Sequence, residues 1–235
     1  MQLDLNKKPM KKKAPYNKGD AYEDKVVEIM RERGVLAPGF QRAGAGGGVD
    51  AIFIHGGNKY NLEIKADLKA DYGQRTFKWS EGGGWTWSKD DPLTRKYTAL
   101  GALKVANGKK FKPNKFVKNK GELTAEDRHQ DQINFEDTSL TTTSDALFKF
   151  YELKNCYYMQ VGDGYGFYSL RCDPANLGAP PFDTRFTLRL RAKVINSFPI
   201  HNYTFYAVLK VLGKPKESPL NIEDVSDTRF PDIEP

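Results

Sequence analysis

The sequence predicts an α/β protein in which a mixed β-sheet is flanked by helices and the C-terminal half is rich in strands. Three patterns support this fold class. Residues 20–34 carry apolar side chains at helical spacing, residues 50–65 read as two short alternating strands around a Gly-Gly pair, and residues 185–194 alternate between apolar and polar side chains. A chain of 235 residues is long enough for one large domain, or for a domain with an appendage.

The N-terminal region divides into a basic arm and a helix. Residues 1–18 contain six lysines and two prolines but little that a core would bury, which predicts a flexible arm. Asp20 is expected to cap the following helix, with Glu23 three residues later as in a capping box. Gly34 is a natural stop for this helix. Its apolar stripe comprises Tyr22, Val26, Ile29 and Met30.

The stretch after a glycine-rich run predicts a β-hairpin that carries the candidate site. A two-residue turn at Gly56-Gly57 sets Asp50 opposite Glu63. Opposed residues of an antiparallel pair lie about 4.5–5.5 Å apart at Cβ, where two carboxylates repel unless a positive charge lies between them. A hard divalent cation such as Mg²⁺ meets that need. Lys65, two residues beyond Glu63, is placed to hold a water or a phosphate beside the metal.

Alternation divides the second strand of this hairpin into two faces. The apolar face consists of Tyr60, Leu62 and Ile64, and the polar face consists of Asn61, Glu63 and Lys65. The other interpretation is an ordinary surface hairpin with a charged, solvated face.

Asp50 and the run Glu63-Ile64-Lys65 resemble the Asp…Glu-x-Lys signature of the PD-(D/E)xK nuclease superfamily. Residues 18–23, the helix to Gly34, residues 40–42 and the glycine-rich run are similar in order to the N-terminal part of archaeal Holliday junction resolvases. Val49 stands where the family name has proline. The resemblance covers about residues 18–80 and implies a restriction-endonuclease-like fold.

The resemblance also implies a metal site. Asp50 and Glu63 would bind Mg²⁺, for which Mn²⁺ would substitute, together with the carbonyl of Ile64. Lys65 would orient the attacking water and offset charge in the transition state.

Two further residues and an oligomeric state follow from the same resemblance. An acid on the N-terminal helix often supports the metal in this superfamily, and Glu23 holds that position, although a capping or surface glutamate is an equal alternative. Gln74 is the candidate for the polar residue that many members carry after the Glu-x-Lys strand. Because resolvases and many restriction enzymes are dimers, a homodimer is an open alternative.

Two cationic stretches predict contacts to nucleic acid. Seven lysines and no acid lie between residues 104 and 120, with two phenylalanines among them. Strand 185–194 places four cations on one face, opposite a purely apolar face. A solvated surface is the alternative for both. The candidate contacts are Lys109, Lys110, Lys112 and Lys115 in the first stretch, and Arg185, Arg189, Arg191 and Lys193 in the second.

The chain is expected to have five parts. These are the arm at 1–18, a nuclease core at 19–120, a polar loop or linker at 121–145, a β-rich extension or second lobe at 146–213, and an acidic tail at 214–235. A helix is predicted at 92–106. Further strands are predicted at 148–152, 157–161, 167–171 and 203–212.

Composition favours a polyanionic partner and an intracellular location. The formal charge of +7 suits DNA, RNA or an anionic membrane. The sequence has no apolar run of the ~18 residues that a membrane span needs and no secretory signal. Two cysteines form neither a zinc pattern nor a disulfide framework. The expectation is a cytoplasmic protein that binds DNA and no membrane.

The sequence therefore predicts a Mg²⁺-dependent DNA endonuclease, either structure-specific as junction resolvases are, or of a restriction or homing type. The alternative is a non-catalytic DNA- or RNA-binding protein that retains a nuclease-like fold.

Overall fold

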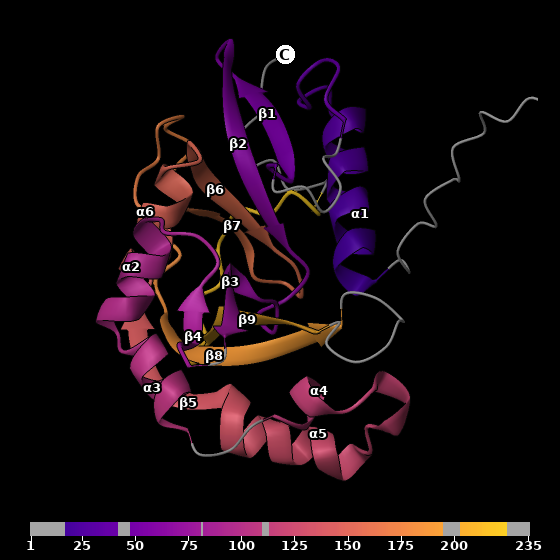
Figure 1. Ribbon diagram of the computed structural model, residues 1–235. Coiled ribbons are helices and arrows are strands. Elements are labelled where there is room, and N and C mark those ends of the chain that lie inside the picture. Colours follow the sequence, from indigo (N-terminus) through magenta and orange to yellow (C-terminus); the bar gives the residue numbers. More distant parts are fainter. Residues whose placement is uncertain (1–16, 42–47, 81, 110–112, 195–202, 225–235) are drawn as a thin grey trace, which may run out of the picture.

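The computed structural model describes residues 17–41, 48–80, 82–109, 113–194 and 203–224, and it is a mixed α/β structure with two sheets. The predicted α/β class is therefore confirmed (Figure 1). The six α-helices of the described residues are α1 (Lys18–Glu32), α2 (Pro92–Ala99), α3 (Ala102–Gly108), α4 (Asn114–Val117), α5 (Ala125–Asp131) and α6 (Asp145–Glu152).

The first sheet is four-stranded and mixed, in the order β1-β2-β6-β7. β1 and β2 are antiparallel, β2 and β6 are parallel, and β6 and β7 are antiparallel. A parallel pair needs a long crossover, and this one runs from Lys65 to Cys156. The four strands are β1 (Ala51–His55), β2 (Asn58–Lys65), β6 (Cys156–Val161) and β7 (Gly166–Ser169).

The second sheet is five-stranded and antiparallel, in the order β4-β3-β9-β8-β5. β8 alternates as the sequence predicts, because Phe186, Leu188 and Leu190 are buried while Arg185 is exposed. Both sheets therefore combine strands from the two halves of the chain. The strands are β3 (Tyr72–Ser80), β4 (Gly84–Trp87), β5 (Asp137–Thr143), β8 (Arg185–Val194) and β9 (Tyr203–Val211).

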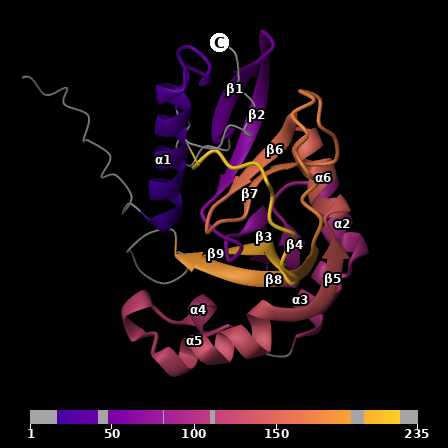
Figure 2. The same cartoon turned by 180° about the vertical axis from the view of Figure 1, so that it is seen from behind.

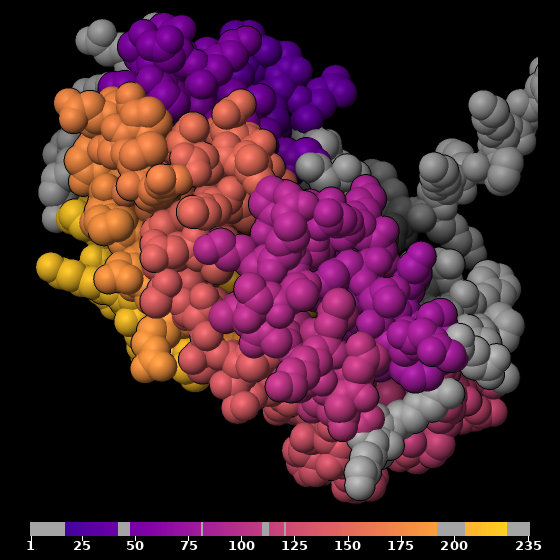
Figure 3. All heavy atoms as spheres, turned by 60° about the vertical axis from the view of Figure 1, so that its left-hand side comes forward, coloured from indigo at the N-terminus to yellow at the C-terminus, as the bar shows by residue number. Residues whose placement is uncertain are grey.

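Two hydrophobic clusters organise the layers. The first packs the stripe of α1 against one face of the four-stranded sheet, where Met30, Phe53 and Ile64 are almost fully buried. The second joins the other face of that sheet to the five-stranded sheet and to α2, α3 and α6. Figure 2 shows α1 alone beside the β1–β2 hairpin, with α2, α3 and α6 grouped on the far side. In Figure 3 the magenta surface around α2 and α3 adjoins the salmon surface of α6.

The polar face of β2 consequently points toward the second cluster and α6. Asn61 donates its side-chain amide to the Lys154 carbonyl, and Glu63 accepts from Tyr151 of α6. This geometry places the candidate acid in a protein interior, so the surface-hairpin interpretation does not describe it.

Several predicted elements differ in the structure. Asn17, not Asp20, caps α1, because its carboxamide accepts from the backbone amides of Gly19 and Asp20, and Asp20 supplies the reciprocal bond of the capping box. The helix predicted at 92–106 is two helices, α2 and α3. They are separated at Gly101, whose φ of +92° an L-residue rarely adopts.

Residues 121–145 are not the predicted polar loop. Thr124 caps α5 through Asp127, and the buried Asp131 accepts the backbone amides of Asn114 and Lys115. A threonine-rich run then forms the edge strand β5, as suits β-branched residues on a half-exposed sheet. Residues 148–152 are also helical, in α6, where Phe148, Phe150 and Tyr151 are buried and Lys149 is exposed. A window this short fits both strand and helix periodicity.

Some predictions fall on residues outside the described ranges. These are the basic arm up to residue 16, most of the glycine-rich run, Lys110 and Lys112, the side chain of Lys193, and the tail from residue 225. Within the described residues, no helix combines the length and apolar character required to cross a membrane.

Candidate active site

The β1–β2 hairpin has the predicted register. Ala51 pairs with Leu62 and His55 pairs with Asn58, so the turn is Gly56-Gly57. Their φ values of +55° and +74° suit a type I′ turn, which matches the twist of the flanking strands. Extending this register by one residue places Asp50 opposite Glu63, as the sequence predicts.

Hydrogen bonds fix both carboxylates. The Oδ2 atom of Asp50 accepts the backbone N–H of Ile64 at 2.8 Å. The Oε1 atom of Glu63 accepts the hydroxyl of Tyr151 at 2.8 Å and lies 2.5 Å from the amino group of Lys65. In the described residues, the second oxygen of each carboxylate has no hydrogen-bond partner.

The two carboxyls differ in their pKa because their surroundings differ. Burial, followed by the charge of Glu63, raises the pKa of Asp50 to about 7. Burial would also raise the pKa of Glu63, but Lys65 and Tyr151 hold it below its usual range. Burial opposes the charge of Lys65, yet Glu63 and Asp50 raise its pKa above the ordinary value. The cluster therefore contains a firmly ionised Glu63–Lys65 pair beside an Asp50 that gives up its proton reluctantly.

A cleft of about 800 Å³ opens above this cluster. Asp50, Glu63, Ile64 and Lys65 form part of its lining, and the N-terminal turn of α1 forms another part. Its remaining walls come from the loop after β2, from β3, from α6 and from Arg191 of β8. Five cations besides Lys65 line the cleft, namely Lys18, Lys69, Arg75, Lys154 and Arg191. Four acids besides Asp50 and Glu63 also line it, namely Asp20, Glu23, Asp67 and Asp71.

The carboxylates of Asp50 and Glu63 are the candidate ligands for the Mg²⁺ that the sequence implies. Within the described residues, no group of three or more His, Cys, Asp or Glu side chains is arranged to hold a metal ion. Mg²⁺ does not require such a group, since it is usually held by one or two carboxylates, with waters and substrate phosphates as the other ligands. Two carboxylates that line the cleft, each with one oxygen outside the hydrogen bonds of the described residues, fit that pattern.

Glu23 and Gln74 both line the cleft. The charge of Glu23 is close enough to Asp50 to raise the pKa of that carboxyl, although it ranks behind burial, Glu63, Lys65 and the bond to Ile64. Gln74 lies on β3 and is exposed. The structure thus brings Asp50, Glu63, Lys65, Glu23 and Gln74 together at one cleft, while their roles stay predictions.

The predicted nucleic-acid contacts are dispersed. Arg191 is the one described member of that set that lines the cleft, and it forms a 2.6 Å ion pair with Asp71. Arg189 pairs with the buried Glu136 at 2.8 Å, and Lys115 contacts the same carboxylate. Lys109 donates to the carbonyls of Asn134 and Asp137. The arginines of β8 at positions 189 and 191 are therefore paired with acids from neighbouring elements. The alternation of side chains along one strand does not reveal such partners.

Comparison with known proteins identifies no relative: no protein-family model matches the chain, and neither a curated protein nor a solved structure matches it.

Sequence reasoning missed three residues that shape the site. Tyr151 holds Glu63, Lys154 contributes to the low pKa of Glu63, and Arg75 lies 4.1 Å from the ring centre of Phe150 beside the cleft. All three lie far from the Asp50–Lys65 stretch in sequence or on another strand. In the sequence, Tyr151 is marked only by its spacing of four residues after Leu147, in a segment whose short apolar run also predicts a strand.

Proposed function

We propose that this protein is a Mg²⁺-dependent nuclease that hydrolyses DNA phosphodiester bonds, with the PD-(D/E)xK-like set Asp50, Glu63 and Lys65 as its catalytic centre. One observation carries the proposal. Two carboxylates and a lysine meet in an 800 Å³ cleft whose walls carry five further cations and four further acids. A protein that only binds nucleic acid gains nothing from two acids at the position where the phosphate would lie, since acids repel phosphate.

Each residue has a distinct part in this proposal. Asp50 and Glu63 would hold the cation through their outward oxygens, with the Ile64 carbonyl beside them. A bound Mg²⁺ would supply polarisation of the phosphate and a lower pKa for the attacking water. Because its pKa is raised, Lys65 keeps its proton, so it is suited to orient water and offset negative charge and unsuited to act as a base. The reaction adds one water across one P–O ester bond.

The orientation of Glu63 depends on Tyr151 and Lys65 together. Their contacts to Oε1 leave Oε2 as the oxygen that faces other ligands. A carboxylate held in this way needs little rearrangement when a cation binds, which is the advantage of a preorganised site.

A cleavage panel tests the proposal. Duplex, nicked, flapped, four-way and single-stranded DNA are incubated with the wild-type chain, with and without Mg²⁺, and with Mn²⁺ in a parallel series. Cleavage of at least one DNA in the presence of the metal, and none with EDTA, is the expected result. Asp50→Asn, Glu63→Gln and Lys65→Ala are each expected to abolish cleavage and to leave binding intact.

Asp90→Asn is the matched control, because it makes the same chemical change at an exposed carboxylate that pairs with Arg95 outside the cleft. Asp90→Asn is expected to cut as the wild type does. If Asp50→Asn or Glu63→Gln cuts at the wild-type rate, the proposed centre is wrong. Tight DNA binding without cleavage under any metal would favour the alternative of a non-catalytic nucleic-acid-binding protein.

A further inference from the structure

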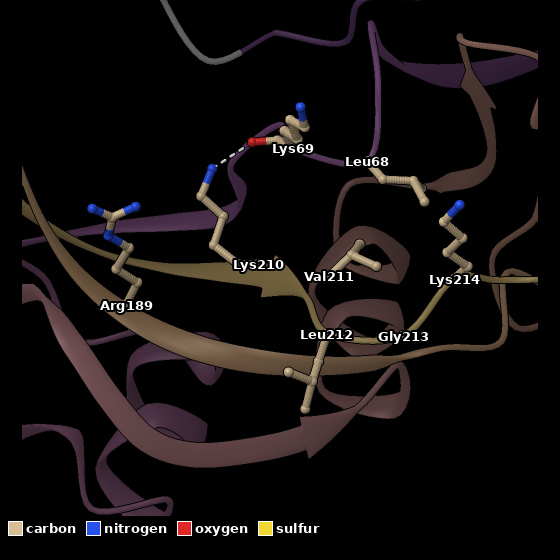
Figure 4. Close-up of a pocket in the computed structure, with 8 residues that line it drawn as sticks. All are labelled: Leu68, Lys69, Arg189, Lys210, Val211, Leu212, Gly213 and Lys214. Carbon is tan, nitrogen blue, oxygen red and sulfur yellow. Dashed lines mark hydrogen bonds between the residues drawn. The ribbon is translucent and has the colours of Figure 1, made fainter.

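A second pocket lies next to the cleft, between the loop after β2 and the end of the β8–β9 pair. It has a volume of about 500 Å³. Its charged lining consists of Lys69, Arg189, Lys210 and Lys214, and no acid is among the residues that line it in the described part of the chain. Figure 4 shows Arg189 at one end, Lys210 and Lys69 together in the middle, and Lys214 at the other end.

The middle of this pocket is built rigidly. The amino group of Lys210 donates to the Lys69 carbonyl at 2.5 Å and lies 2.7 Å from Asp71. Its side chain is only 18% exposed, and this burial lowers the pKa of Lys210. The cation is therefore held in one place before any ligand arrives, which reduces the entropy lost on binding.

The acids near the pocket do not balance its cations. Asp71 is shared by Arg191 and Lys210, and Glu136 is shared by Arg189 and Lys115. Each of these two carboxylates thus serves at least two cations, and Arg189 also lies 3.4 Å from Asp137.

The exposed lysines add further positive charge. Lys69 and Lys214 are exposed, and neither forms an ion pair with the residues that the structure describes. The pocket consequently has a net positive charge at neutral pH, and its most accessible charges are those two lysines.

The pocket shares a lining residue with the cleft of the candidate active site. Lys69 lines both cavities, and Asp71, which lines the cleft, holds Lys210 of the pocket. A chain of phosphates leaving the cleft past Lys69 would meet Lys210 and then Lys214 without crossing an unpaired acid of the described lining.

We infer that this pocket binds an internal phosphodiester group of the same nucleic acid strand whose scissile phosphate lies in the cleft. The inference rests on the proposed function and deepens it, because it assigns the path of the strand on one side of the cut. Contacts to phosphate carry no sequence information, so the pocket would position the strand without selecting its sequence.

The test measures binding on the cleavage-deficient Asp50→Asn background, so that the DNA stays intact. Affinity for one duplex is measured at several salt concentrations for the double variant Lys69→Gln/Lys214→Gln. Each lost phosphate contact reduces the slope of log affinity against log salt by about 0.9 on duplex DNA. Because the pocket is inferred to hold one phosphate, the double variant is expected to lose about 0.9 in slope and roughly tenfold in affinity near 0.1 M salt.

Lys59→Gln is the matched control, since this exposed lysine lies on β2 near the hairpin turn, away from both cavities. It is expected to keep the parental slope. An equal slope in the double variant and in the control would overturn the inference. A slope that falls as much in Lys59→Gln would overturn it too, because the effect would then be one of total charge.

Two further arms separate the possible causes. Oligonucleotides with and without a 5′-phosphate should bind equally. A preference for the terminal phosphate that disappears in the double variant would overturn the internal assignment. Wild-type cleavage, measured separately, reports on the proposed function. A wild-type chain that cuts DNA while the double variant keeps its slope disproves only the pocket, whereas a chain that neither binds nor cuts DNA disproves both.

Discussion

Asp50 is predicted to destabilise the metal-free protein at neutral pH, so Asp50→Asn should stabilise it. The folded pKa of about 7 exceeds the usual 3.8 because of burial and then the charge of Glu63. Between those two values the folded state keeps a proton that the unfolded chain has released. The contribution of protonated Asp50 to the free energy of unfolding is therefore fully present below about pH 4 and is lost as the pH rises to about 7.

The magnitude follows from the size of this shift. Each pKa unit is equivalent to about 1.4 kcal/mol, so a shift of about three units gives an upper bound of about 4 kcal/mol. A gain of about 2 kcal/mol, within that bound, is the expected measurable effect. Asparagine removes the charge, and its side-chain oxygen can still accept the Ile64 amide. For a chain of this size the gain corresponds to about 4–8 °C in Tm.

Thermal unfolding in EDTA from pH 4 to pH 8 measures the effect. The Tm of Asp50→Asn should equal that of the wild type near pH 4 and exceed it increasingly toward pH 8, with Asp90→Asn following the wild type. Added Mg²⁺ should raise the Tm of the wild type and leave that of Asp50→Asn unchanged. Equal melting temperatures for the two proteins at pH 8 would refute the argument that Asp50 carries an unfavourable charge.

Two further substitutions probe contacts that the sequence alone did not reveal. Tyr151→Phe removes the hydroxyl that donates to Glu63, so it should lower the free energy of unfolding by about 1 kcal/mol in chemical denaturation. Unchanged stability in Tyr151→Phe would show that this hydrogen bond contributes nothing to holding Glu63. Arg189→Gln should cost about 1–2 kcal/mol in chemical denaturation, because it removes one of the cations that pair with the 3%-exposed side chain of Glu136. Arg185→Gln, on the same strand but exposed, should cost almost nothing, and a loss equal to that of Arg189→Gln would contradict the buried-pair argument.

The hairpin could be predicted in detail because its determinants are local. A Gly-Gly turn and period-two alternation fix the register, and the register alone places Asp50 opposite Glu63. β8 was predictable with its bounds for the same reason. The register and bounds of a strand can be predicted in this way when the alternation of its side chains indicates which face is buried.

Other features depend on contacts that no local pattern encodes. Tyr151 reaches Glu63 from α6, and the acid that pairs with Arg191 is Asp71, 120 residues away in sequence. The short apolar run of α6 fits both helical and strand periodicity, so burial by its neighbours decides its conformation. Polar residues 121–145 become ordered because Asp131 ties α5 to α4, a contact that composition does not indicate.

The parallel pairing of β2 with β6 has a consequence for how the chain is made. Leu62 pairs with Tyr158, and on the other sheet Phe77 of β3 pairs with Phe205 of β9. Contacts this distant in sequence slow folding, because a large loop must close before they form. During translation the hairpin with Asp50 and Glu63 leaves the ribosome long before the strands and the helix that hold it. The cluster is therefore assembled only after residues 151–161 have been synthesised, and a nascent chain that ends before them does not yet contain it.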